Sequence, residues 1–379
     1  MKLLRISILL CSLLLLTSCI ETLQLEDLGI ILSRGVDSTE DQELEITMAI
    51  LQFMKDAPST TKTVSGSGKT LKAAVQDANK SVSQEIVPGK IDLEIYGRDL
   101  AEQGLNPILD TLRRDADIPN TLLLAVADSK ASELFTVEEE SINTNLGEFL
   151  RGLIQPGTEE QLFPEVPLPG FSTTIRNEGI DPILPILGLR DGLPALVGIA
   201  LFKDDKMVGE LPLEYEGYFK MMEGTLRNYF LNLTVPIKAL EPYLVDMKHA
   251  EQFDHIDMSL VVEKGKSKIK LKNKEKLQYD TNVNIKLNLQ EINVPLKLDL
   301  PEAVSKLENE IEKKIKENYE NILSHLKEVN SDAFGYGITY RIQNKDGKLT
   351  DEEWDAKFPQ IEVKYDVKAR IVQQGEVHR

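Results

Sequence analysis

Residues 90–127 read KIDLEIYGRDLAEQGLNPILDTLRRDADIPNTLLLAVA, and they carry the clearest fold signal in the chain. Lys90–Tyr96 and Thr121–Ala127 are short apolar runs of strand length. Between them, Asp99–Arg114 has the length and apolar spacing of a helix. The alternation of strand, helix and strand predicts a mixed α/β region whose strands are neighbours in one sheet.

On the N-terminal side, the same pattern of short elements continues. Leu28–Val36 and Leu44–Leu51 are predicted strands around a polar turn. Lys69–Ser81 has apolar residues at helical spacing and is a predicted helix, with Thr70 or Ser67 as its cap. Pro58–Ser67 is rich in Ser, Thr and Gly, so we expect a loop there.

On the C-terminal side, seven prolines interrupt residues 155–195, and this segment is predicted to be an extended crossover on the surface. Further on, Ile256–Glu263 and Ser267–Leu277 are predicted as two strands, and Gly337–Arg341 also alternates like a strand. Residues 300–329 carry one apolar stripe with charges elsewhere, which predicts the longest helix of the chain.

These elements predict an α+β fold class, a mixed α/β multi-domain body with antiparallel or mixed sheets and packed helices. The expected division is a signal peptide at 1–18, an N-terminal mixed α/β region at 19–196, and a C-terminal α+β domain at 197–379. The N-terminal region has room for two subdomains, with the proline-rich crossover 155–195 at its end.

The N-terminus has the pattern of a secretory signal that ends in Leu16-Thr-Ser-Cys19. Lys2 and Arg5 precede an apolar run that is too short for a permanent membrane span. A small residue before a cysteine resembles the bacterial lipobox, which implies cleavage before Cys19 and attachment of a lipid to its sulfur. The alternative is an ordinary signal peptide with an incidental cysteine. The lipobox predicts a mature chain anchored to the outer face of a membrane.

The net charge limits the classes of partner, and the cysteine content limits the possible disulfides. The formal net charge of −18 becomes −20 when Lys2 and Arg5 leave with the signal. An acidic surface repels nucleic acid and anionic lipid headgroups, so we expect no nucleic-acid partner. The basic cluster Lys264–Lys276 is the exception, and its alternation with apolar residues indicates a solvated strand face. Only Cys11 and Cys19 exist, so the mature chain can form no internal disulfide.

Two motifs approach known ligand sites without completing them. Residues 64–70, VSGSGKT, resemble a phosphate-binding loop, but Thr63 stands where its first glycine belongs. Residues 342–353 match an EF-hand loop at several ligand positions, but Ile342 occupies the first one and an apolar side chain cannot coordinate calcium. The structural alternatives are a helix cap and a polar turn.

The sequence offers no catalytic constellation. His249 and His255 lack metal-ligand spacing, and no Gly-x-Ser-x-Gly nucleophile elbow occurs. No free cysteine remains for thiol chemistry in the lipidated chain. We therefore predict no catalytic residue, no cofactor and no metal site, and a protein that is not an enzyme.

Several runs together resemble the C-subunit lipoproteins of bacterial spore nutrient germinant receptors, the Ger(x)C family. They include Leu25–Leu32, Lys90–Gly97 and Gly198–Gly209. The most specific are Ala333-Phe-Gly-Tyr-Gly337 and Trp354–Val363 near the C-terminus. The resemblance covers nearly the whole chain. Ile20-Glu21 departs from the Trp-Asp that members often carry after the cysteine, which weakens inferences about contacts close to the tether.

The resemblance implies a three-part α/β body on the outer face of the spore inner membrane. It implies assembly with two integral-membrane subunits, one with a large soluble domain and one resembling an amino-acid transporter, and a role in nutrient-triggered germination. The faces expected to meet these partners are exposed parts of 155–195 and the surface around Phe334–Tyr336, although packing of Phe334 into the core is an equal alternative. The runner-up functions are a solute-binding lipoprotein of a transporter and a lipid-anchored enzyme.

Overall fold

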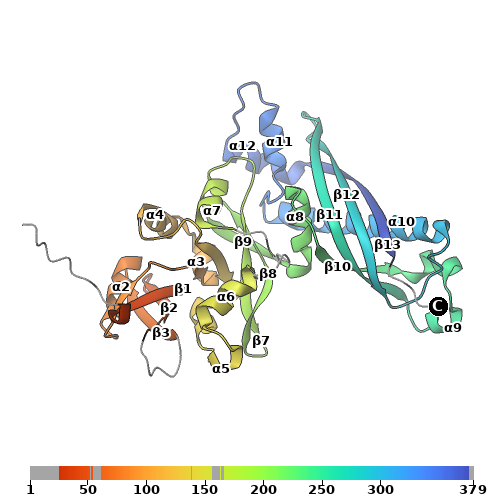
Figure 1. Ribbon diagram of the computed structural model, residues 1–379. Coiled ribbons are helices and arrows are strands. Elements are labelled where there is room, and N and C mark those ends of the chain that lie inside the picture. Colours follow the sequence, from red (N-terminus) through yellow and green to blue (C-terminus); the bar gives the residue numbers. More distant parts are fainter. Residues whose placement is uncertain are drawn as a thin grey trace, which may run out of the picture.

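The computed structural model describes residues 25–51, 53, 61–137, 139–155, 163 and 166–374. The strands are β1 (Leu28–Ser38), β2 (Leu44–Leu51), β3 (Thr61–Gly68), β4 (Glu85–Val87), β5 (Leu93–Tyr96), β6 (Leu123–Ala127), β7 (Ile183–Arg190), β8 (Leu193–Lys203), β9 (Lys206–Pro212), β10 (Tyr229–Pro236), β11 (His255–Asn273), β12 (Gln278–Ile292) and β13 (Glu362–Gln374). Their arrangement confirms the predicted α+β fold class (Figure 1).

Helices connect and cover these strands. The α-helices are α2 (Leu71–Asn79), α3 (Arg98–Gln103), α4 (Asn106–Arg114), α5 (Glu139–Ile142), α6 (Leu146–Ile154), α7 (Leu168–Ile175), α8 (Glu216–Glu223), α9 (Met247–Ala250), α10 (Pro301–Glu328), α11 (Tyr336–Ile342) and α12 (Asp351–Lys357). Short 3-10 helices are η1 (Leu25–Asp27), η2 (Ala131–Phe135), η3 (Leu213–Tyr215), η4 (Ile237–Ala239), η5 (Glu241–Tyr243) and η6 (Phe358–Gln360). Within the described ranges, no helix is long and apolar enough to cross a membrane.

The first sheet is mixed. Within the described residues it has nine strands in the order β3-β2-β1-β5-β6-β7-β8-β9, with β4 beside β1. The central strands β1, β5, β6 and β7 run parallel, and antiparallel hairpins close both sides. Residues 90–127 supply β5, α3, α4 and β6, which confirms the predicted order of strand, helical segment and strand. The single helix predicted at Asp99–Arg114 is wrong, because Gly104 at φ +121° ends α3 and α4 begins at Asn106. Parallel strands need cover on both faces, and helices supply it.

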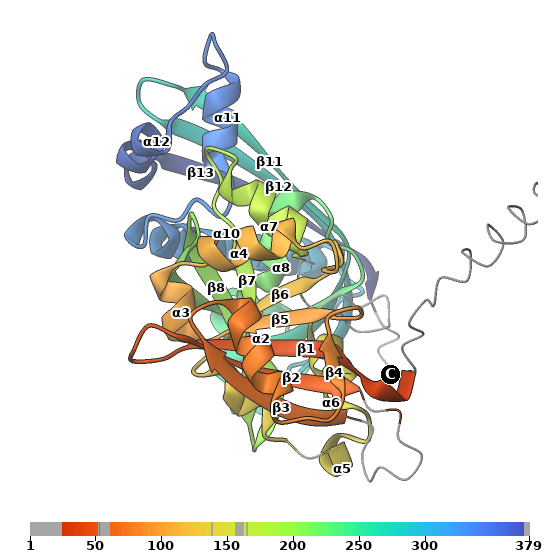
Figure 2. The same cartoon turned by 90° about the vertical axis from the view of Figure 1, so that its left-hand side faces the viewer.

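Two apolar layers lie on the two faces of this sheet. One layer contains α2, α3, α4 and α7, and Figure 2 shows α2 and α4 on the side nearest the viewer. The other layer contains η2 and α6, and it continues without a break into the second half of the chain. The two halves therefore share one hydrophobic core.

The second sheet has the strand order β10-β11-β12-β13. β10, β11 and β12 form an antiparallel meander, and α10 then crosses over so that β13 lies parallel to β12. The predicted helix at 300–329 is confirmed as α10, whose apolar stripe (Leu307, Ile311, Ile315, Tyr319, Ile322) is buried. The opposite face of β11, β12 and β13 carries exposed residues.

Four further predicted details are wrong, and in the first two the pairing with a neighbouring strand overrides the local pattern. Pro58–Ser67 is predicted as a loop, but Thr61–Gly68 pairs with β2 along its whole length. The two strands predicted at 256–277 are one continuous strand, β11, bent by bulges. The strand predicted at 337–341 is helix α11.

The fourth correction concerns the proline-rich segment 155–195. Its described part holds α7, β7 and the start of β8 instead of an extended crossover. Pro169 sits in the first turn of α7, where a helix needs no backbone donor, so it favours the helix start. Residues 156–162, 164 and 165 lie outside the described part of the chain.

Candidate functional site at the junction of the two sheets

A short segment after α10 joins the two halves of the molecule. The amide of Asp332 donates to Oδ2 of Asp181 at 2.8 Å, and the amide of Asp181 donates to the carbonyl of Asp332 at 3.1 Å. Ser331 Oγ donates to the carbonyl of Phe202 in β8 at 2.6 Å. These bonds fasten residues 331–332 to the edge of β7 and β8 in the first sheet.

The carboxylate of Asp332 is the centre of this site. It is fully buried and accepts the amides of Gly335 at 2.9 Å, Tyr336 at 3.0 Å and Gly337 at 2.8 Å. It also accepts Nε1 of Trp354 at 3.0 Å. One side chain thus shapes the turn 332–337 and attaches it to α12.

Burial controls the charge of this carboxyl. Loss of solvent raises the pKa of Asp332 to about 7, against the opposing effect of the Gly337 and Tyr336 amides. Burial also raises the pKa of Asp181. Lys203 in β8 lowers the pKa of Asp181 against this effect, with Nζ 3.5 Å from Asp181 and 2.5 Å from Asp355. The site is a buried acidic pair with one lysine beside it.

Glycine is required where the two halves touch. A Cβ on Gly179 would lie 2.4 Å from the carbonyl carbon of Gly337, and φ of Gly179 is +91°. The amide of Ile338 donates to the carbonyl of Gly179 at 3.0 Å across the same contact. Only a residue without a side chain allows two backbones to approach this closely.

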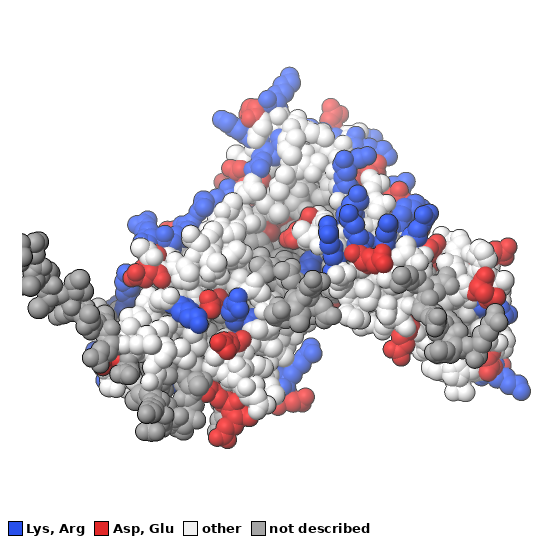
Figure 3. Space-filling model, in the orientation of Figure 1, with Lys and Arg blue, Asp and Glu red and all other residues white. Residues whose placement is uncertain are grey.

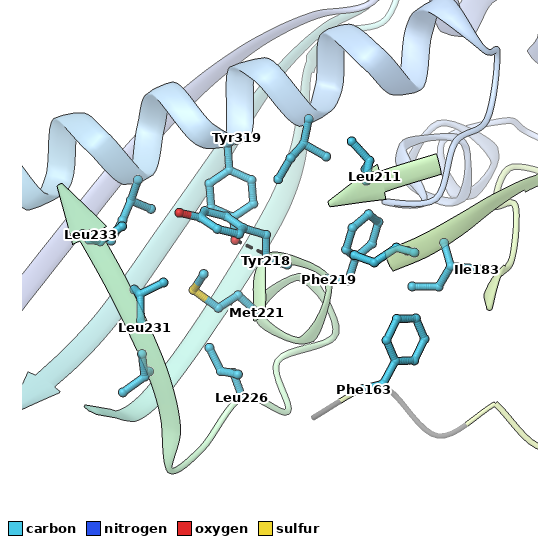
Figure 4. Close-up of a cluster of buried hydrophobic side chains, with 14 of the residues drawn as sticks. Phe163, Ile183, Leu211, Tyr218, Phe219, Met221, Leu226, Leu231, Leu233 and Tyr319 are labelled. Atoms are coloured by element: carbon cyan, nitrogen blue, oxygen red, sulfur yellow. Dashed lines mark hydrogen bonds between the residues drawn. The ribbon is translucent and has the colours of Figure 1, made fainter. Parts of the chain in front are cut away.

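Aromatic side chains fill the space behind the turn. The Phe334 ring centroid lies 5.1 Å from that of Phe219 in α8, and Tyr336 lies 5.1 Å from Tyr279 in β12. Figure 4 shows the neighbouring part of this core, where Tyr218 from α8 faces Tyr319 from α10 and Phe219 points toward Ile183. Phe334 and Tyr336 are 6% and 0% exposed, so the expectation that they form a partner surface is wrong. The alternative, packing into the core, holds for Phe334.

A cavity of about 360 Å³ lies beside the turn. Its lining is mostly apolar, including Phe219, Phe334 and Ile183, with the carboxyl groups of Asp181 and Glu223 as acidic members. Among the described residues, no group of three or more His, Cys, Asp or Glu side chains has the geometry of a metal site. The junction is built to hold the two halves together.

The two near-miss motifs have structural roles in the fold. Thr70 caps α2 by accepting the amide of Ala73 at 3.2 Å, as the helix-cap alternative predicts. Gly66 and Gly68 let α2 lie directly on β3, because a Cβ on Gly66 would be 2.4 Å from the carbonyl of Ala74. Oδ1 of Asn344 in the EF-hand-like segment accepts a hydrogen bond from Nζ of Lys274, which directly follows β11. The segment is a turn between α11 and α12.

The site residues predicted from the sequence and those found in the structure differ. Cys19, the predicted lipidation site, lies outside the described residues. Asp181, Lys203 and Asp332 were not singled out by the sequence analysis. For Asp332, the sequence signal was its position, because it directly precedes the run Ala333–Gly337 that carries the family resemblance.

Comparison with known proteins places the chain among spore germination proteins. A family model described as the spore germination protein N-terminal domain matches residues 21–189, and one described as spore germination B3/GerAC like, C-terminal, matches residues 197–375. The chain belongs to the Ger(x)C family. The junction described above therefore joins the two conserved parts of a Ger(x)C protein, and β8 begins before the second part.

Relatives of this Ger(x)C chain match along nearly its full length. Spore germination protein GerQC of Bacillus cereus is 22% identical, covering 95% of this chain and 96% of that protein. Spore germination protein B3 of Bacillus subtilis (strain 168) is 22% identical over 98% of both chains. The crystal structure of the GerBC protein covers 90% of this chain and 97% of its own, with a TM-score of 0.56 and 18% identity. That likeness shows that the two proteins share the fold.

Proposed function

We propose that this protein is the lipoprotein C subunit of a spore nutrient germinant receptor and takes part in nutrient-triggered germination without catalysing a reaction. The observation that carries the proposal is the match of both Ger(x)C parts, which together run from residue 21 to residue 375. The division into a signal peptide, an N-terminal region to 196 and a C-terminal domain from 197 is part of this proposal.

The proposed subunit acts through partners. It assembles with two integral-membrane receptor subunits, one with a large soluble domain and one resembling a transporter. The shared core and the Asp181–Asp332 contact support this role, because they make the two halves one body that can present fixed surfaces. Leu189 and Leu193, exposed at the tip of the β7–β8 hairpin within 155–195, are candidates for such a surface.

The proposed location is the outer face of the spore inner membrane, with the lipid on Cys19 as the anchor. Replacing Cys19 with Ala removes the attachment atom, so the protein is expected to leave the membrane fraction. Radiolabelled palmitate is the direct readout. Continued labelling of the Cys19→Ala variant would refute the lipobox interpretation. It would not contradict the receptor role.

A gene deletion tests the receptor role. Spores without this protein and its paralogues should fail to respond to one class of nutrient, while a surfactant or calcium dipicolinate, which should bypass the receptor, still triggers germination. Tagged protein should co-purify with the two membrane subunits, and both should fall in abundance in the deletion strain. Normal nutrient germination in that strain would overturn the proposal, and co-purification with an ATP-driven importer would favour a solute-binding lipoprotein.

A further inference from the structure

The outer face of the second sheet is a basic surface. Strand pairing places twelve residues in four rows across β11, β12 and β13. The rows are Lys264–Lys286–Arg370, Lys266–Asn284–Lys368, Lys268–Asn282–Asp366 and Lys270–Asp280–Lys364. Alternation along each strand places all twelve side chains on the face opposite the buried one. Eight are Lys or Arg and two are Asp, and we call this set the basic face. At the β13 edge, Lys368 Nζ lies 3.9 Å from Glu312 of α10.

Most of these cations have no counterion among the residues that the structure describes. Every Lys and Arg of the basic face is exposed, and Figure 3 shows such side chains gathered over β11 and β12. Asp280 pairs with Lys272 at 3.6 Å, and Asp366 pairs with Lys368 at 3.9 Å. Within the described part of the chain, no acidic side chain lies within 4.0 Å of seven of them: Lys264, Lys266, Lys268, Lys270, Lys286, Lys364 and Arg370.

The basic face lacks the features of a protein-binding surface. None of its twelve residues is apolar, whereas protein interfaces have an apolar core and are depleted in lysine. A depression of about 480 Å³ over Asn284 and Lys286 is lined mostly by cations of the basic face, with Glu308 and Glu312 of α10 at its margin. Seven of the eight cations are lysines, which act as mobile point charges without a fixed bonding direction. Such a surface suits a partner whose negative charges are spread over a plane and have no fixed positions.

Over the dimensions of the basic face, its own positive charge has more effect than the negative net charge of the whole protein. The four rows extend about 20 Å along the strands, at roughly 3.4 Å per residue. Charges are screened over about 8–10 Å at physiological salt, so acids elsewhere on the molecule have little effect at the centre of the face. The expectation that the acidic chain repels anionic headgroups therefore does not extend to this surface.

We propose that the basic face adsorbs to the surface of an anionic phospholipid bilayer. The face lies at the end of the molecule away from β1, which follows the proposed lipid anchor (Figures 1 and 2). A lipid at one end and basic contacts at the other fix how the body lies on the membrane. The orientation rests on the proposed anchoring, whereas the adsorption does not.

Sedimentation with lipid vesicles tests the adsorption. The protein is the chain from residue 19 with Cys19→Ala, which retains every described residue and carries no lipid. We expect it to bind vesicles of equal parts phosphatidylcholine and phosphatidylglycerol at about 0.01 M salt, and to be released near 1 M salt. Vesicles of phosphatidylcholine alone should not retain it.

Variants assign the binding to the basic face. Neutralising one lysine should weaken binding about fivefold, so the triple variant Lys266→Gln, Lys268→Gln, Lys270→Gln should lose roughly 100-fold. The matched control is Lys62→Gln, Lys69→Gln, Lys90→Gln, which removes three exposed lysines of the first half that have no ion pair among the described residues, and it should bind like the parent. Thermal unfolding verifies that both variants fold.

Two outcomes would overturn the proposal. Equal binding to charged and uncharged vesicles, or equal loss in both triple variants, would show that the basic face is not the contact. Binding to soluble polyglutamate that depends on Lys266, Lys268 and Lys270, without binding to charged vesicles, would assign the face to an acidic protein instead. Labelling by palmitate in vivo is unaffected in either case, so failure here is distinct from failure of the anchor.

Discussion

Asp181 and Asp332 are joined by two hydrogen bonds, one to the side chain of Asp181 and one to the backbone carbonyl of Asp332. The amide of each residue donates to an oxygen of the other, although they are 151 residues apart in the chain. Asp181 immediately precedes the first sheet's strand β7, and Asp332 follows α10 of the second half. The pair therefore fixes the positions of the two Ger(x)C parts relative to each other.

Replacing Asp332 with Ala should destabilise the protein strongly. The change leaves the amides of Gly335, Tyr336 and Gly337 and the Trp354 indole without their acceptor in a buried site. The expected loss in the free energy of unfolding is about 3–5 kcal/mol, measured by urea denaturation. The exposed Asp346→Ala variant is the control, with a change within about 0.5 kcal/mol. Equal effects would contradict the central role of Asp332.

Gly179→Ala should open the junction for a steric reason. Its Cβ would collide with Gly337, while the conformation at φ +91° adds backbone strain. Gly192→Ala separates these two effects, because φ is +79° there and nothing lies within 4 Å of the added carbon. We expect about 1 kcal/mol for Gly192→Ala and clearly more for Gly179→Ala in thermal unfolding. Similar unfolding midpoints for the two variants would show that backbone strain alone, and not the collision with Gly337, causes the destabilisation.

The buried ion pair of Arg34 in β1 and Glu94 in β5 should behave as a unit. Nε of Arg34 lies 3.1 Å from Oε2 of Glu94, and both side chains are almost fully buried. Arg34→Met alone strands a buried carboxylate and should cost about 3–5 kcal/mol. Adding Glu94→Leu should restore most of that loss, because both charges are then gone. A double variant no more stable than the single one would refute the coupling.

Two glutamates of α10 protect the free edge of the second sheet. Oε1 of Glu312 accepts the amide of Ala369 at 3.0 Å, and Oε1 of Glu308 accepts the amide of Ile371 at 2.8 Å. These amides lie on β13, the last strand of the sheet. Glu308→Ala with Glu312→Ala should bare the edge and promote self-association in sedimentation velocity experiments. The Glu317→Ala variant changes an exposed residue of the same helix, and its self-association should equal that of the parent protein.

The contribution of Glu216 to stability should fall as pH rises. Burial raises the pKa of Glu216 from about 4.5 to about 7, despite the nearby Lys220 and Tyr229. The folded state then holds a proton that the unfolded state has lost, so stability present below about pH 4.5 is lost by about pH 7.

The variant Glu216→Gln isolates this group. It keeps the shape of the protonated side chain and cannot ionise. Relative to the parent, its free energy of unfolding should rise by up to about 3 kcal/mol between pH 4.5 and pH 8. A difference independent of pH would show that Glu216 titrates normally in the folded protein.

Regular elements with a strong local pattern were predictable. The helix expected at 300–329 is α10, Pro301–Glu328, because its apolar stripe repeats over many turns. Leu44–Leu51 is β2 with the predicted bounds, and Thr70 caps α2. In these places the residues that determine the element lie within or beside it, so the sequence contains the whole argument.

Tertiary structure alone decided the rest. The Ser-, Thr- and Gly-rich residues of β3 have little strand preference of their own, and they form a strand because β2 supplies the hydrogen bonds and α2 needs Gly66 and Gly68 beneath it. Lysines spaced along β11 could be identified as one strand face, but the rows that join them to Arg370 depend on the crossover of α10. Asp332 has no unusual local sequence, and it becomes the centre of a site because folding removes water and brings Asp181, Gly337 and Trp354 to its two oxygens.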